Sequence, residues 1–214
     1  MSYASLDDLR SQLGAKLETP ESAAYAAKML HSLPAYTVVD RAVFILQRCA
    51  GKRVLEFGAS GAMHDGIVKV AAVYMGVDRE DGPNICGFDL DAMGWPALPM
   101  FRESFAGPFV TLSIPEIIVC GEVLEHLGNP LWFLTRLQRQ YPDVPLIVTV
   151  PNAFSSAAAK WIERGVENVN LDHVAWYSPT TLRVLLTRAG YTSGSLYFYN
   201  GDGPRAEGLI MVTE

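Results

Sequence analysis

The fold is decided by residues 53–65, RVLEFGASGAMHD, where a short apolar run ends in an acid and is followed by glycine and small residues. Residues 54–57 have the pattern of a buried parallel strand, and Gly58 to Ala62 that of a tight turn. Apolar residues then recur at helical spacing from His64 to Met75. A strand, a glycine-bearing turn and a helix form the first half of a nucleotide-binding βαβ unit, so the sequence predicts a doubly wound, Rossmann-like α/β fold.

The acid of this stretch is Glu56, two positions before the first glycine. A carboxylate there is poorly placed beside a pyrophosphate but suits the cationic amino group of an amino-acid-like ligand. The turn residues Gly58, Ala59, Ser60 and Gly61 let the backbone approach such a ligand closely. Two alternatives stay open: a purely structural turn, and the loop of an NAD-dependent oxidoreductase.

Length and composition indicate one α/β domain with helical additions, because 214 residues are few for two domains. No run approaches the roughly 18 apolar residues of a membrane span, and the acidic start is unlike a signal peptide. Cys49, Cys86 and Cys120 stand singly, as reduced core thiols of a cytoplasmic protein would. The net charge of −6, with no basic tract, counts against nucleic-acid binding.

Residues 1–50 are expected to form a helical extension, ahead of a main domain over residues 51–214. One helix is expected to begin at Thr19-Pro20, where threonine is a good cap and proline a good first helical residue. A second helix is expected from about Thr37 to Cys49. The extension either packs against the sheet or forms a lid over the ligand.

The second strand is expected at Ile85 to Phe88, with Asp89 and Leu90 at its carboxyl end. In a doubly wound sheet an acid at that position lies beside the ribose of a bound nucleotide, so Asp89 is the expected ribose ligand. Asp91 is a competitor that would instead cap the next helix. Residues 92–109 leave room for a short helix and a third strand.

A second anchor is PEIIVCGEVLEHL, residues 115–127, which predicts a strand, a turn at Gly121 and a helix from Glu122 to about Gln140. On such a helix Glu122, Glu125 and His126 share one face at the ligand-binding edge of the sheet. Three polar groups there fit general acid–base catalysis or metal ligation. The alternative is acids favoured by the helix dipole, with His126 in a packing role.

The remaining elements follow from turn and cap residues. His173 is placed in a loop on the ligand side of the sheet. The expected elements are a strand at Pro145–Asn152, helices at Ser155–Arg164 and from Pro179 to Gly190, and an antiparallel hairpin of Gly194–Tyr199 and Gly208–Thr213.

The segments VLEFGASGA, GFDLD, IIVCGEVLEHLGNP, LIVTVPN and DHVAWYSPTTLRVLLTRAGY, in this order, resemble the class I S-adenosylmethionine-dependent methyltransferases. The resemblance covers about residues 50–214 and implies a seven-stranded sheet, mostly parallel, with a C-terminal antiparallel hairpin. It implies S-adenosylmethionine as the cofactor, with Glu56 balancing its ammonium group and Asp89 holding its ribose. Ser60 and Ala62 replace two of the usual glycines. The implied cofactor-binding residues are Glu56, Gly58, Ala59, Ser60, Gly61, Asp89, Leu90, Gly121 and Glu122.

The expected reaction is methyl transfer to a hydroxyl, less readily an amine, of a small molecule, sugar or glycan. Such a transfer needs positioning and a base, for which His126 is the first candidate and His173 the second, with Glu122 beside them. The aromatic residues Trp161, Trp176 and Tyr177 either stack on the acceptor or belong to the core.

Three other functions stay open. The pattern E-x-x-E-H with a later histidine also resembles small-RNA 2′-O-methyltransferases, which would make Glu122, Glu125, His126 and His173 ligands of a divalent metal. The altered glycine turn allows a non-catalytic binding module. An NAD-dependent oxidoreductase is disfavoured by Glu56 and by the lack of a Tyr-x-x-x-Lys pair.

Overall fold

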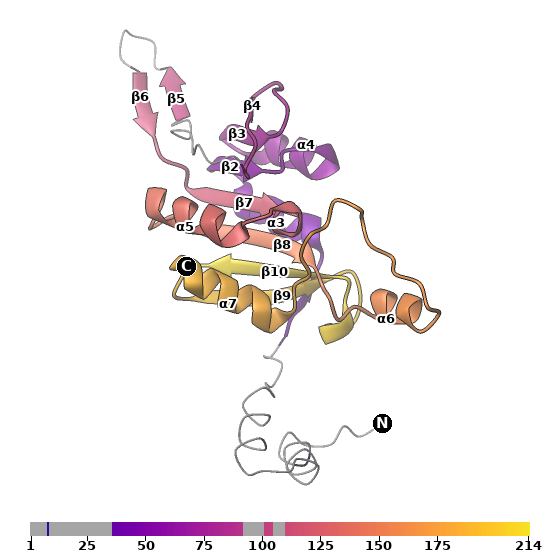
Figure 1. Ribbon diagram of the computed structural model, residues 1–214. Coiled ribbons are helices and arrows are strands. Elements are labelled where there is room, and N and C mark those ends of the chain that lie inside the picture. The colour runs from indigo at the N-terminus through magenta and orange to yellow at the C-terminus, as the bar shows by residue number, and fades with distance from the viewer. Residues whose placement is uncertain (1–7, 9–35, 92–100, 105–109) are drawn as a thin grey trace. The chain divides into compact units, whose positions relative to one another are not determined.

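The computed structural model describes Asp8 and residues 36–91, 101–104 and 110–214 (Figure 1). Contacts divide the chain after Ala35, and Tyr36–Glu214 forms one compact unit. The helix expected from Thr19 and the short helix expected after Asp91 lie outside the described residues.

The described residues form an eight-stranded sheet with the order β1-β9-β10-β8-β7-β2-β3-β4. Neighbouring strands from β8 to β4 are parallel, whereas β10 runs antiparallel to both β8 and β9. The strands are β1 Val38–Val39, β2 Arg53–Phe57, β3 Val73–Asp78, β4 Ile85–Gly87, β7 Ile117–Gly121, β8 Leu146–Pro151, β9 Gly194–Tyr199 and β10 Gly208–Thr213. A separate two-stranded antiparallel sheet pairs β5 (Phe101–Ser104) with β6 (Val110–Ser113).

Helices cover both faces of the main sheet (Figure 1). Those of the described residues are α3 Arg41–Cys49, α4 Gly61–Val70, α5 Pro130–Gln140, α6 Ser156–Ile162 and α7 Pro179–Ala189, with 3-10 turns η1 Leu124–His126 and η2 Gly203–Arg205. One apolar core joins the sheet to α5 and α7, and a second joins its other face to α3 and α4. The predicted doubly wound fold is therefore confirmed, with a short extra strand, β1, beside β9.

The C-terminal third follows its local signals. Ser178 caps α7 with its side chain, Pro179 is the first helical residue, and Gly190 ends the helix in the left-handed conformation at φ 106°. Strands β9 and β10 have the predicted bounds and pair antiparallel.

The predicted helix from His64 to Met75 is wrong at both ends. Helix α4 begins at Gly61 and ends at Val70, and Val73–Asp78 is a strand of the sheet. Val54 of β2 pairs in register with Tyr74, so sheet hydrogen bonding prevails where the apolar pattern alone was ambiguous. The loop between β3 and β4 therefore starts only after Asp78.

The helix expected from Thr37 begins later, at Arg41. Asp40 caps α3 by accepting a hydrogen bond from the amide of Val43, which fixes the helix start. The β-branched Val38 and Val39 form β1 instead.

The helix expected from Glu122 is also wrong before Pro130. Glu122 has a left-handed backbone at φ 57°, and a 3-10 turn follows. Asn129 caps α5 and Pro130 is its first residue, a start signal that outweighs the apolar periodicity upstream.

Cys49 and Cys120 are buried as expected, whereas Cys86 on the edge strand β4 is exposed. Among the described helices, none combines the length and apolar character needed to cross a membrane.

Candidate functional site

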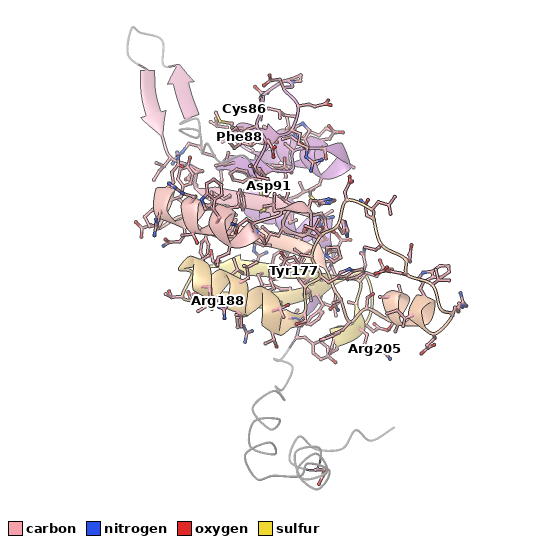
Figure 2. All side chains as sticks on the ribbon, viewed as in Figure 1. Cys86, Phe88, Asp91, Tyr177, Arg188 and Arg205 are labelled. Carbon is pink, nitrogen blue, oxygen red and sulfur yellow. The ribbon has the colours of Figure 1, made fainter. Side chains whose placement is uncertain are left out.

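A cavity of about 640 Å³ lies at the carboxyl ends of the parallel strands β2, β3 and β7. This is the edge at which doubly wound proteins bind ligands. Phe88 and Asp91, both labelled in Figure 2, belong to its wall. The remaining lining residues are Arg41, Ala42, Leu46, Glu56, Gly58, Ser60, Ala62, Met63, Asp78, Arg79, Asp89, Leu90, Gly121, Glu122, Val123, His126, Leu127 and Asp172.

The turn after β2 has the geometry that its glycines predict. Gly58 has φ 75°, and a Cβ there would lie 2.5 Å from the side chain of Val123, so glycine is required. Gly61 has φ 68° and open space where a Cβ would stand. Seven of the nine predicted cofactor residues line the cavity; Ala59, which packs over Gly76, and Gly61 are not in its wall.

Glu56 at the cavity floor is 2% exposed and has hydrogen-bonding partners. The Tyr74 hydroxyl donates to Glu56 Oε2 over 2.6 Å, and His64 Nδ1 lies 2.8 Å from the Tyr74 hydroxyl and 3.4 Å from the same carboxylate. Burial raises the pKa of Glu56, while the Tyr74 hydrogen bond and His64 oppose that rise. Glu56 is thus a carboxylate held in a fixed position.

Two acids compete for the position beside a nucleotide ribose. Asp78 is the last residue of β3, next to β2, whereas Asp89 follows β4 at the sheet edge. Both line the cavity. Asp91 instead accepts hydrogen bonds from the amides of Gly128 and Asn129, tying this loop to the segment before α5.

Glu122 is engaged by side chains from three other elements. Its Oε1 accepts hydrogen bonds from Thr149 of β8 over 2.9 Å and from the Tyr199 hydroxyl of β9 over 2.7 Å. Arg41 Nη2 of α3 lies 3.9 Å from the same oxygen. Its left-handed backbone turns Glu122 toward these partners.

Glu125, His126 and His173 form a separate cluster whose ligand atoms all lie within 4.8 Å of one another. The two imidazole rings are edge to face with centroids 4.6 Å apart. Glu125 is 1% exposed, and neither carboxylate oxygen has a hydrogen-bond partner among the described residues. Burial, reinforced by the charge of Glu122, raises the pKa of Glu125 to about 8.

His173 is brought to this cluster by the long loop between α6 and α7. The amides of Val174 and Ala175 donate hydrogen bonds to the Glu125 carbonyl, which holds the loop against η1. Burial and the neighbouring His126 lower the pKa of His173, which favours a neutral imidazole able to accept a proton.

The three aromatic candidates differ in role. Tyr177, labelled in Figure 2, is a core residue whose hydroxyl donates to the Leu124 carbonyl. Trp161 and Trp176 are both partly exposed.

Three cavity features were missed from the sequence. Asp78 follows Glu56 at close to the roughly 20-residue spacing expected of an acid that binds ribose. This signal was hidden because the helix expected from His64 to Met75 covered the start of β3. The partners Tyr74 and His64 needed the pairing of β2 with β3, and Arg41 needed the packing of α3 beside Gly121.

The fold and the cavity define a class I S-adenosylmethionine-dependent methyltransferase architecture, as predicted. The chain belongs to the methyltransferase domain family, whose sequence profile matches residues 5–195. No curated protein sequence is similar enough to the chain to match it.

Solved structures share this fold at low sequence identity. Small RNA methyltransferase HEN1 superposes with a TM-score of 0.61 at 14% identity, over 86% of this chain; the match spans only 26% of HEN1. Magnesium protoporphyrin IX methyltransferase from Synechocystis PCC 6803, solved with bound SAH, superposes with a TM-score of 0.52 at 10% identity. This match covers 100% of this chain and 89% of that protein's chain. A possible histamine N-methyltransferase from Thermotoga maritima superposes with a TM-score of 0.51 at 16% identity. This match covers 79% of this chain and 92% of that protein's chain.

Proposed function

We propose that the protein transfers a methyl group from S-adenosylmethionine to a hydroxyl group of a small-molecule acceptor. The observation that carries this proposal is the arrangement of one cavity, with the buried Glu56 at its floor and His126 in its wall. Its volume of about 640 Å³ is in the range of ligand sites.

The lining residues fit the cofactor's groups. Glu56 suits the ammonium group and Arg41 the carboxylate of the methionine part, because they are opposite charges in one wall. Asp78 suits the ribose hydroxyls from the end of β3, with Asp89 as the second acid. Bound S-adenosylmethionine supplies an electrophilic methyl group on a sulfonium.

The two histidines, His126 and His173, are placed to act as bases on the acceptor. His126 lines the cavity, and His173 stands beside it with a lowered pKa. Either imidazole can take the proton of an acceptor hydroxyl as the oxygen forms its bond to the methyl carbon. Glu122 is a positioning residue here, because Thr149 and Tyr199 already donate hydrogen bonds to its Oε1 and fix the carboxylate.

The first test is calorimetric titration with S-adenosylhomocysteine, with NADH as the control. Micromolar binding of the first and none of the second supports the proposal. Binding of S-adenosylhomocysteine without turnover on any screened acceptor would favour a non-catalytic module instead. An amine acceptor, the less favoured chemistry, is included in the same screen.

A second candidate is a metal-dependent 2′-O-methyltransferase, and the unpartnered Glu125 beside two histidines favours it. A carboxylate and two imidazoles suit a divalent transition metal. Of the four ligands implied by the sequence, the cluster contains Glu125, His126 and His173, but not Glu122. The net charge of −6 weighs against an RNA acceptor.

Chelation separates the two candidates. Activity that disappears with chelator and returns with Mn²⁺ or Zn²⁺ supports the metal site, provided that Glu125→Ala also abolishes metal uptake measured by calorimetry. Activity indifferent to chelator removes this candidate.

A further inference from the structure

The exposed apolar side chains are concentrated in one segment. Of thirteen large hydrophobic residues exposed in the described part of the chain, seven fall between positions 154 and 176. A surface of this kind marks a place where an apolar partner binds. The seven are Phe154, Trp161, Ile162, Val166, Leu171, Val174 and Trp176.

Part of this segment lines a second, open cavity of about 460 Å³, formed by α6 and the loop that follows it. Five of its lining residues are apolar, and Glu167 is the one charged residue among those that the structure describes there. The size is that of a small-molecule site. The lining is Ala153, Ala158, Ile162, Gly165, Val166, Glu167, Asn168 and Trp176.

The second cavity shares its loop with the candidate catalytic site. Asn168 and Trp176 line the second cavity, whereas Asp172 lines the first and His173 contacts His126. Figure 1 shows this loop passing the end of the sheet at which β7 and β8 terminate. The hydrogen bonds to the Glu125 carbonyl hold it there.

The apolar lining of the second cavity favours an apolar ligand over a sugar or a nucleotide. A sugar or a nucleotide carries hydroxyls and phosphates along its length, and each would lose hydration against these side chains with few partners in return. A ring or alkyl body gains free energy from the same contact, and Trp176 offers an aromatic face for it.

We infer that the second cavity binds the apolar, ring-sized body of the methyl acceptor, a phenol-like molecule whose hydroxyl reaches His126 and His173. This inference rests on the proposed methyl transfer and narrows its acceptor class. It predicts that glycans and RNA are poor acceptors.

The test uses the full chain and 2-naphthol as the probe, with methyl β-D-glucoside as the polar control. Binding is measured by ligand-detected NMR and calorimetry, with and without S-adenosylhomocysteine. Ile162→Asp puts a carboxylate into the cavity at a side chain that is 69% exposed, so the fold tolerates it. Val184→Asp on α7, at a residue 44% exposed outside the lining, is the matched control.

Saturable 2-naphthol binding, weakened at least tenfold by Ile162→Asp and unchanged by Val184→Asp, is the expected result. No saturable binding, equal binding by the two variants, or preferred binding of the glucoside overturns the inference. So does a dimer that dissociates in Ile162→Asp during sedimentation, since the surface would then join two copies. Failure of S-adenosylhomocysteine to bind is read separately and removes the proposed function.

Discussion

Two buried carboxylates stand at the same edge of the sheet and have opposite surroundings. Glu56, near the carboxyl end of β2, has Tyr74 and His64 on its carboxylate, whereas Glu125, after β7, has no hydrogen-bond partner among the described residues. Burying a charge without a partner is costly. The difference indicates a carboxylate already held by partners at the proposed cofactor end and, at the proposed acceptor end, a group that awaits a proton or a metal.

The largest expected effect is on turnover, and it should distinguish His126 from the residues around Glu56. His126→Ala removes a candidate base, so turnover with a working acceptor should fall by about 10²–10⁴-fold at unchanged affinity for S-adenosylhomocysteine. His64→Ala disturbs the surroundings of Glu56, so it should weaken that affinity and leave turnover at saturating cofactor nearly intact. Kinetics and calorimetry on both variants measure this, and full activity of His126→Ala would make that residue a packing residue.

The next largest effect is on the pH dependence of the free energy of unfolding, through the carboxyl of Glu125. A carboxyl whose pKa is about 8 in the folded state and 4.5 in the unfolded chain stabilises the fold fully below about pH 4.5. It loses that contribution as the pH rises from about 4.5, and the loss is complete above about pH 8. Glu125→Gln should therefore gain stability over wild type progressively from about pH 4.5 to about pH 8, and the gain should level off at up to about 5 kcal/mol.

Denaturant unfolding at several pH values, in chelator, measures this gain. The same measurement is repeated with Mn²⁺, because a bound cation would stabilise the charged form of Glu125 and reverse the stability advantage of the glutamine variant. Equal stability of the two proteins at pH 9 would show that Glu125 has partners in solution.

A smaller effect tests the partners of Glu56. Tyr74→Phe removes the hydroxyl that donates to this carboxylate, and should cost about 1.5–3 kcal/mol of stability at pH 7. Tyr141→Phe is the control, because among the described residues the one partner of its hydroxyl is the Gln140 amide, at 3.4 Å. If both variants unfold at the same denaturant concentration, Glu56 does not depend on Tyr74.

The smallest effect decides between the two ribose acids. Asp78→Ala should weaken S-adenosylhomocysteine binding by about tenfold, or about 1.4 kcal/mol, because Asp78 ends the strand beside β2. Asp89→Ala should weaken it less. If calorimetry shows the larger loss of affinity in Asp89→Ala, Asp89 is the ribose ligand. If neither variant loses affinity, neither acid belongs to the site.

Local signals in the sequence were sufficient for much of the fold. The strand and glycine turn at residues 53–62, the capped helix α7 and the final hairpin were predictable, because each depends on neighbours a few positions away. Strand β3 was not, because Val73 to Met75 continue an apolar pattern that fits a helix equally well and only pairing with β2 decides.

The family, the doubly wound architecture and the short segments that reach the ligand edge can all be inferred from local sequence patterns. Which acids have partners cannot, because it depends on long-range packing. Glu122 and Glu125 are three positions apart and were expected to act together, yet the left-handed turn at Glu122 directs one to Thr149 and Tyr199 while the other meets His126 and His173. Partners of this kind come from β8, β9 and a distant loop, and contacts across such separations leave no trace in local spacing.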